Sequence, residues 1–501
     1  MNPYGPRLLS GRVLAASAAW SLTAQVIPAM AGIITIPFII RSLGVERFGV
    51  LTLAWMVIGY FGLFDLGLGR AVTKFAAELL ASPRDARMNG LVWTAWYLML
   101  AIGLVGAAVL TTIARWLVTS AIKVPPDLRP ETLQAFYLLA WSIPIIVLTT
   151  GFRGLLEAAQ RFKLTSLVKI PMGVLTFVAP LLVLRFTSNL AVIVLALIAV
   201  RLAGAIVYAI MCHQAVHHHS TPTPIDREAA RTLLGFGAWI TVSNIISPLM
   251  VGVDRLFVGA FVSVAAVAYY ATPFEAVTKL LILPGAIAAV LFPAFATAST
   301  IDRARVLDLF RTGMRAVFLG LYPITFIVVT FAPELLRIWL GDTFASQSTQ
   351  VLRWLALGVL MNSLAAMPFA LLQGIGRSDA TAKIHLLEAP VYVILMVWLI
   401  REHGINGAAI AWCIRTTIDL SLLYWCAGRY VGATTSRELR DIAFLTGLLA
   451  ALGAGLLVQS SAQKASVTSV LLIGVAVLAW RWGIGTHQRG IVARLLKLGD
   501  S

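Results

Sequence analysis

Charged side chains within long apolar stretches are the residues in this sequence best suited to carry out chemistry. Each would cost roughly 3 kcal/mol or more if it faced lipid, so it is expected to face a cavity or a partner. Buried arginines and lysines bind anions such as phosphates or acidic sugars, whereas buried carboxylates bind protons or cations. The anion-binding candidates are Arg201, Arg255, Lys169, Lys279 and Arg415, and the ion-coupling candidates are Asp254, Glu275, Glu388 and Asp419.

Two pairs among these candidates have a second interpretation. Glu275 and Lys279 are four residues apart, as are Arg415 and Asp419, so each pair lies on one helix face and can neutralise itself. Arg201 has no acidic residue near it in its own apolar stretch. A cavity-lining role is therefore favoured for Arg201, and both roles stay open for the two pairs.

Enzyme signatures are missing from the sequence. It contains no P-loop, no GxSxG and no HExxH motif. The histidine tract at 217–219 lies in a polar loop, and Cys212, Cys413 and Cys426 form no CxxC motif. We therefore predict no enzymatic activity, no cofactor, no metal site and no disulfide bonds.

The composition is that of a membrane protein. Hydrophobic residues make up 59% of the 501 residues, charged residues only 12%, and the mean hydropathy is +0.88. The apolar residues fall into blocks of about 20, the length that a helix needs to cross the hydrocarbon core. The net charge of +17 arises mainly from short loops between these blocks. It therefore indicates contact with membrane lipids rather than with nucleic acid.

These blocks predict an all-α, polytopic protein with about fourteen transmembrane helices. The first block resembles a signal peptide, but its apolar sequence continues to Ile40, so we interpret it as a span. The predicted spans are 13–40, 48–66, 91–119, 132–152, 164–185, 189–212, 233–262, 264–298, 314–332, 350–373, 380–400, 405–427, 439–459 and 466–485.

The loops predict the orientation of the chain. Alternate loops carry 24 basic residues against 10. Because basic loops stay inside, both termini are expected in the cytoplasm. The ten basic residues of the loops expected to face outward are Arg41, Arg47, Arg115, Lys123, Arg129, Arg185, Arg337, Arg353, Arg401 and Lys464.

A weak internal repeat suggests the domain organisation. Ala19-Trp20 resembles Ala238-Trp239, and two further matches give offsets between 216 and 219 residues. An offset of six helices indicates a parallel repeat, as between the halves of many transporters. We expect six-helix bundles at 1–232 and 233–436, followed by two further helices and a cytoplasmic tail at 437–501.

Several motifs resemble those of one known family. PFIIRSLGVERFGVL at 37–51 and FDLGLG at 64–69 resemble the opening of polysaccharide-biosynthesis flippases. VDR at 253–255, AYY at 268–270 and FP at 292–293 resemble the opening of their second half. LQGIGR at 372–377 and GINGAAIA at 404–411 are similar to the region of helices 10–12. The sequence thus resembles the multidrug/oligosaccharidyl-lipid/polysaccharide exporter superfamily.

This resemblance implies a function. Such a flippase moves a polyprenyl-diphosphate-linked oligosaccharide, of the O-antigen type, from the inner to the outer leaflet of the bacterial cytoplasmic membrane. The headgroup rides in a cationic central cavity, and two alternating states, coupled to H⁺ or Na⁺, expose it to either side. The implied partners are the lipid-linked glycan, membrane lipids and the polysaccharide polymerase machinery, with the transporter itself a monomer.

Three other classes compete with this interpretation. A multidrug exporter of the same superfamily moves cationic drugs with twelve helices, which fits the surplus of buried basic residues poorly. A major-facilitator transporter would carry a DRxGRR-like run after helix 2, where this chain has Asp65 to Arg70. A glycan polymerase or ligase would need a large outer loop, and the sequence has none.

Overall fold

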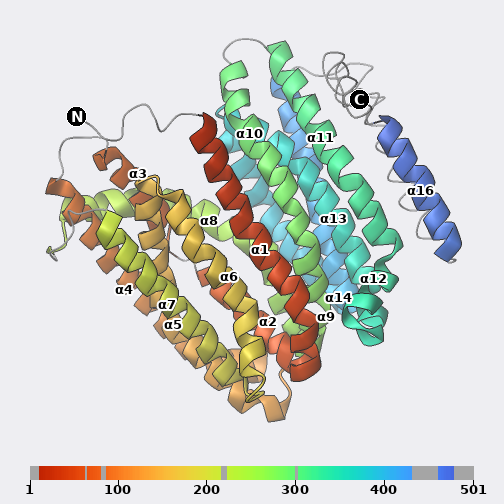
Figure 1. Ribbon diagram of the computed structural model, residues 1–501, viewed down its shortest axis with the longest axis horizontal. Helices are drawn as coiled ribbons and strands as arrows, with labels where there is room; N and C mark the ends of the chain where they lie inside the picture. Colours follow the sequence, from red (N-terminus) through yellow and green to blue (C-terminus); the bar gives the residue numbers. More distant parts are fainter. Residues whose placement is uncertain are drawn as a thin grey trace, which may run out of the picture. The chain divides into compact units, whose positions relative to one another are not determined.

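The computed structural model describes residues 11–61, 65–80, 86–215, 223–299, 303–431 and 461–478. Every regular element in these ranges is a helix (Figure 1). Helices dominate because the bilayer core offers no water, so each backbone N–H and C=O must find its partner within the segment. The predicted all-α membrane class is therefore confirmed.

The chain divides into two compact units, Met1–Ala271 and Thr272–Ser501. The first unit holds α1 (Gly11–Leu43), α2 (Val45–Phe61), α3 (Leu68–Leu80), α4 (Ala86–Trp116), α5 (Arg129–Ala158), α6 (Phe162–Val183), α7 (Leu190–Ala215), α8 (Arg227–Phe261) and the start of α9 (Val264–Thr278). The second holds the end of α9, then α10 (Ile282–Ser299), α11 (Arg303–Thr330), α12 (Ala332–Leu340), α13 (Asp342–Gly374), α14 (Ser378–Val431) and α16 (Ser461–Leu478).

Within the first unit, α8 packs against α2, α3 and α4. Residues after the predicted boundary at 232 and 233 therefore belong to the first compact unit. The predicted six-helix bundles and their parallel repeat concern how two sets of helices superpose, which a division into compact units does not test. They therefore stay predictions. The predicted span 439–459 and the tail after 478 lie outside the described residues.

Nine helical stretches in the described ranges are long and apolar enough to cross a membrane. They are 22–43, 87–121, 126–158, 162–183, 190–214, 264–298, 303–330, 342–374 and 378–430. The last contains two predicted spans, 380–400 and 405–427. Gly404 separates them with a left-handed backbone (φ 57°, ψ −135°), which turns the chain into a helical hairpin.

Two short amphipathic helices were missed by the hydropathy pattern. The residues of α3 and α12 were predicted to be loops, but both segments are helical with one buried face. α3 buries Leu68, Ala71, Val72 and Ala76, and α12 buries Ala332 and Leu336. A short helix of this kind carries too few apolar residues to register as a span.

One predicted span is also interrupted. Residues 264–298 were expected to form a single helix, but a 3₁₀ turn at Lys279–Leu281 separates α9 from α10. Such turns mark a local change in helical hydrogen bonding. The stretch is still long and apolar enough to form one membrane span, and Lys279 lies at the 3₁₀ turn within it.

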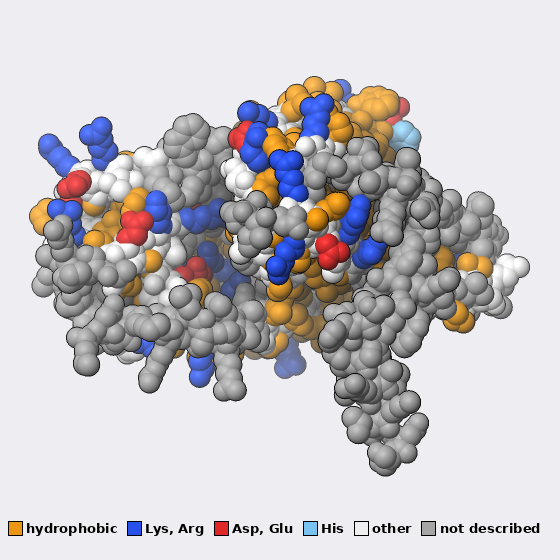
Figure 2. All heavy atoms as spheres, turned by 90° about the horizontal axis from the view of Figure 1, so that it is seen from above, with side chains coloured by type: hydrophobic (Ala, Val, Ile, Leu, Met, Phe, Trp, Pro, Cys, Tyr) orange, Lys and Arg blue, Asp and Glu red, His pale blue; other side chains and the backbone are white. Residues whose placement is uncertain are grey.

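Contacts between the ends of the helices agree with the two predicted sets of loops. Each joins residues that the sequence assigns to the same side of the membrane. Arg47 pairs with Glu131 at 2.8 Å, the Lys123 ammonium donates to the Phe261 carbonyl at 2.6 Å, Lys464 pairs with Glu334 at 2.7 Å, and Arg377 lies 4.4 Å from the ring centre of Tyr430. Figure 2, turned by 90° from Figure 1, shows Lys and Arg side chains among hydrophobic ones on the face seen from above.

The Lys464–Glu334 pair also attaches α16 to the rest of its unit. Lys464 is almost fully buried, and α16 packs along α11. Burial alone would raise the pKa of Glu334, but the hydrogen bond and charge of Lys464, with Arg337 nearby, hold that pKa below its usual value. The predicted helix 466–485 is thus present in part and tied to the second unit.

Candidate functional site

Three helices of the first unit, α5, α6 and α7, pack against one another (Figure 1), and each carries a basic side chain. α6 and α7 run against each other along one facing stripe. The Tyr208 hydroxyl donates to the Thr165 carbonyl at 3.0 Å, and a Cβ on Gly204 would overlap the sulfur of Met172. The missing side chain at Gly204 thus lets the two helices approach closely.

Arg201 lies on this stripe, nearly one turn before Gly204. Its guanidinium donates to Thr176 Oγ1 on α6 at 3.3 Å. Tyr208, two turns along α7, is its electrostatic neighbour on the same helix. The predicted absence of an acidic partner on its own helix thus holds: α7 contains no Asp or Glu.

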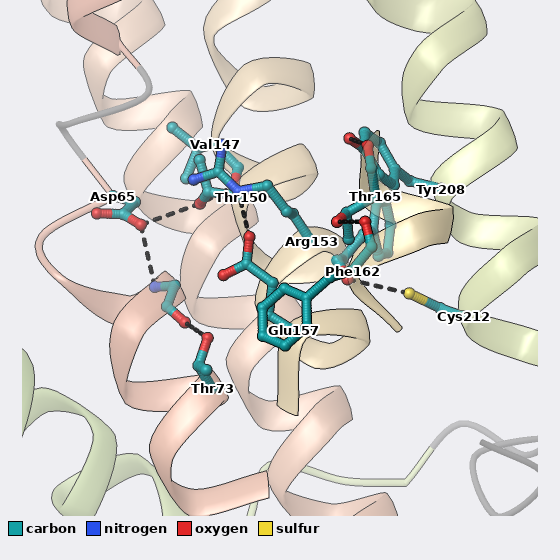
Figure 3. Close-up of polar contacts among 12 residues, drawn as sticks. Asp65, Thr73, Val147, Thr150, Arg153, Glu157, Phe162, Thr165, Tyr208 and Cys212 are labelled. Carbon is teal, nitrogen blue, oxygen red and sulfur yellow. Dashed lines mark hydrogen bonds and ion pairs between the residues drawn. The ribbon is translucent and has the colours of Figure 1, made fainter. Parts of the chain in front are cut away.

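Lys169 lies on the same stripe of α6, one turn after Thr165. Arg153 and Glu157 of α5 are close enough to act on it electrostatically. Arg153 and Glu157 pair with each other at 3.5 Å (Figure 3). Arg153, Glu157, Lys169, Arg201 and Tyr208 are called the α5–α7 cluster below, and their formal charges sum to +2.

The FDLGLG motif is structural in this fold (Figure 3). The carboxylate of Asp65 accepts from the backbone N–H groups of Gly67 at 2.9 Å and Gly69 at 3.0 Å, which caps the start of α3. Thr150 of α5 donates to the same carboxylate at 3.0 Å. A Cβ on Gly154 would lie 2.6 Å from the Gly69 carbonyl oxygen, so α3 and α5 touch through their backbones.

Asp254 and Arg255 are both buried in α8. Asp254 accepts from the Tyr270 hydroxyl on α9 at 2.5 Å and from the Arg255 backbone N–H at 2.8 Å. The VDR and AYY motifs therefore meet each other, and Asp254 joins α8 to α9. Its predicted ion-coupling role and the anion-binding role of Arg255 stay predictions.

Glu275 and Lys279 form the ion pair that their spacing predicted. Lys279 Nζ lies 2.9 Å from Glu275 Oε2, and the two side chains are 39% and 32% exposed. The pair spans the break between α9 and α10. The ion pair predicted from the spacing is thus present, and the anion-binding role of Lys279 and the ion-coupling role of Glu275 stay predictions.

The pair gives a direct prediction. Lys279→Gln alone should lower the yield and thermal stability of the protein, because Glu275 loses the positive charge that lies 2.9 Å from its carboxylate. The double variant Glu275→Gln/Lys279→Gln should recover folding and much of the transport. Size-exclusion chromatography after heating, together with glycan export in cells, measures both. A double variant that folds but does not transport would instead assign Lys279 to substrate binding.

The remaining candidates meet in the hairpin of α14. Glu388 and Arg415 are electrostatic neighbours, and Asp419 lies near both. His385 Nε2 is 3.3 Å from Asp419 Oδ1, and the Arg415 guanidinium lies 5.7 Å from the ring centre of Tyr392. The predicted Arg415–Asp419 spacing is present, but the side chain that lies within 4 Å of the Asp419 carboxylate is His385, a contact that is ionic only when the imidazole is protonated.

The nine candidates therefore fall into four places: the α5–α7 cluster, the α8–α9 contact, the α9–α10 junction and the α14 hairpin. Sequence reasoning missed His385 and Tyr392 and assigned Arg153 to a loop. The i,i+3 and i,i+4 spacing of His385 and Tyr392 from Glu388 was the available signal. In the described ranges, no three His, Cys, Asp or Glu residues are placed to hold a metal ion, and the 217–219 tract lies outside them.

The sequence and the fold are matched by known proteins. A family model described as polysaccharide biosynthesis protein matches residues 38–349, more than half of the chain. The chain belongs to this family. The "Putative O-antigen transporter" of Shigella flexneri is 30% identical over 406 residues, which cover 81% of this chain and 96% of that protein. The membrane protein EpsK of Bacillus subtilis is 24% identical over 79% of both chains.

Solved structures show the same fold at low sequence identity. The lipid II flippase MurJ in an inward closed conformation superposes with a TM-score of 0.72 at 11% identity, over 93% of this chain and 99% of that one. An inward-facing multidrug transporter of the MATE family gives 0.68 at 14% identity, over 83% and 94%. The family membership and the superfamily fold thus agree with the predicted resemblance, and they agree with the prediction that this membrane protein is not an enzyme.

Proposed function

We propose that this chain moves a polyprenyl-diphosphate-linked oligosaccharide from the inner to the outer leaflet of the bacterial cytoplasmic membrane. The observation that supports this most directly is the α5–α7 cluster. It offers three cations from three adjacent helices against one carboxylate. A diphosphate carries the opposite charge and several acceptor oxygens, which arginine and lysine bind well.

The three cations lie at increasing depth from one end of their helices. Arg153 is five residues from the end of α5, Lys169 seven residues into α6, and Arg201 fourteen residues from the end of α7. At 1.5 Å per residue these positions are about 8, 10 and 21 Å from that end. In the predicted orientation this is the cytoplasmic end, so a headgroup entering there would meet each cation in turn.

Alternating access would then carry the headgroup across. The diphosphate and sugars would stay with the cations, while the polyprenyl tail remains in the bilayer. A related fold has been solved in both inward- and outward-facing conformations of a MATE transporter. The cytoplasmic placement of both termini, coupling to H⁺ or Na⁺, a monomeric state and contact with the polymerase machinery belong to this proposal.

The proposal is tested in a strain that lacks the chain. The lipid-linked glycan should accumulate, and a membrane-impermeant lectin should label little of it on the outer leaflet of spheroplasts. The wild-type chain should restore labelling. Unchanged labelling in the deleted strain, together with greater drug sensitivity, would replace this function with the multidrug-exporter alternative.

A further inference from the structure

The α14 hairpin buries a set of ionisable side chains that headgroup binding does not use. Glu388 is 5% exposed, Asp419 4% and Arg415 9%. His385 lies one turn before Glu388, pairs with Asp419 and stacks on Phe369 of α13, with ring centres 5.8 Å apart. These four ionisable residues are called the α14 cluster.

Glu388 is the exceptional member of this cluster. Neither of its carboxylate oxygens accepts a hydrogen bond from any residue in the described part of the chain. Its electrostatic neighbours are Asp419, Arg415 and His385. Burying an ionised carboxylate that accepts no hydrogen bonds costs much free energy, whereas burying its protonated form costs far less.

Three elements packed against α14 carry other charged residues. α9 meets α14 where the ring centres of Phe274 and Trp412 lie 5.5 Å apart, and Glu275, next to Phe274, pairs with Lys279. α13 carries only Asp342 and Arg353, both toward its opposite end. α11 meets α14 where Phe310 contacts Tyr424, and the charged residues near that point are Asp308, Arg311 and Arg315. None of these is among the electrostatic neighbours of Glu388.

The charge balance within the α14 cluster leaves room for one proton. When the His385 imidazole is neutral, the two carboxylates and Arg415 sum to −1, so one proton, carried by Glu388 or by His385, makes the cluster neutral. Glu388 is ten residues into α14, and Asp419 is twelve residues from its end. Because α14 folds back at Gly404, its first and last residues lie at the same end of the hairpin. At 1.5 Å per residue, Glu388 and Asp419 are about 15 and 18 Å from that end, near the middle of a hydrocarbon core about 30 Å thick. A net charge at that depth is strongly disfavoured.

We propose that the α14 cluster binds one exchangeable proton, held as the carboxylic acid of Glu388 in one state and released from it in the other. Binding forms the O–H bond of Glu388, and release returns the proton to water through the His385–Asp419 pair. A proton suits the site better than a metal ion, because these side chains are not placed as a metal-binding set and Arg415 repels a cation. The energetic coupling of this proton to glycan movement rests on the proposed function.

Infrared difference spectra of the purified full-length protein test proton binding without any glycan. Between about pH 5 and about pH 8, the wild type should gain and lose the carbonyl band of a protonated carboxylic acid. Glu388→Gln should lose that band. Glu402→Gln, which removes an exposed carboxylate from the same hairpin, should keep it. A band that persists in Glu388→Gln would overturn the proposal, and Glu388→Asp, which should keep the band, provides a second reading if Glu388→Gln folds poorly.

Transport under an imposed pH gradient tests the coupling separately. Outer-leaflet labelling by the wild type and by Glu402→Gln should change several-fold with the gradient, whereas labelling by Glu388→Gln should not respond. A gradient response in Glu388→Gln equal to that of the wild type would overturn the coupling. A wild type that shows the infrared band but moves no lipid-linked glycan would leave the proton site intact and refute the proposed function instead.

Discussion

Replacing Arg201 with alanine is expected to abolish export of the surface glycan while the protein level stays nearly normal. Arg201 is the deepest cation of the α5–α7 cluster, and Thr176 orients its guanidinium. Removing one member of a buried, hydrogen-bonded charge pair costs about 2–5 kcal/mol of binding, or at least roughly thirtyfold in affinity. Immunoblots of the surface glycan and of tagged protein from the same cells measure both quantities.

Two controls separate binding from folding at this position. Arg201→Lys should restore part of the export, because it keeps the charge but loses the planar, two-pronged donor. Arg185→Ala, which removes an exposed arginine from the connection between α6 and α7, should export normally. Normal export by Arg201→Ala would remove Arg201 from the path of the headgroup.

Replacing Gly407 with alanine is expected to destabilise the protein severely. Gly407 follows the turn at Gly404 in the α14 hairpin, and a Cβ there would overlap the Leu399 carbonyl. The obstacle is backbone, so the two halves of the hairpin must separate to admit one methyl group. We expect a loss of about 3 kcal/mol or more and a lower yield, measured by thermal unfolding in detergent.

A matched substitution in the same helix controls for helix propensity. A Cβ on Gly428 would meet nothing within 4 Å, so Gly428→Ala should be neutral or slightly stabilising. Equal thermal stability of the Gly407 and Gly428 variants would show that the hairpin does not close at Gly407.

Some pairs of charges were predictable and others were not. Glu275 and Lys279 are neighbours on one helix face, so their spacing alone predicted the ion pair at 2.9 Å. Arg415 and Asp419 have the same spacing, yet Asp419 pairs with His385. His385 comes from the other half of the hairpin, and local spacing carries no information about a partner that arrives through a turn.

The glycines of the family motifs were also predictable only in part. The sequence identified Gly49 and Gly407 as parts of family motifs, but not what they contact. In the fold, a Cβ on Gly49 would overlap the Val264 carbonyl at the start of α9, as one on Gly407 would overlap that of Leu399. In this chain both motif glycines therefore serve close packing of the backbone, a role that carries no information about the substrate.

What the sequence by itself determined is the membrane class, the approximate spans and the charges that need a partner. These follow from two local requirements: backbone groups must be satisfied within each segment, and a charge in hydrocarbon is costly. Only the tertiary structure decided that Arg153 joins Lys169, that Thr176 joins Arg201, that His385 joins Asp419, and that α3 and α12 are helices with a buried face. Those outcomes depend on which helices pack together, which no single segment specifies.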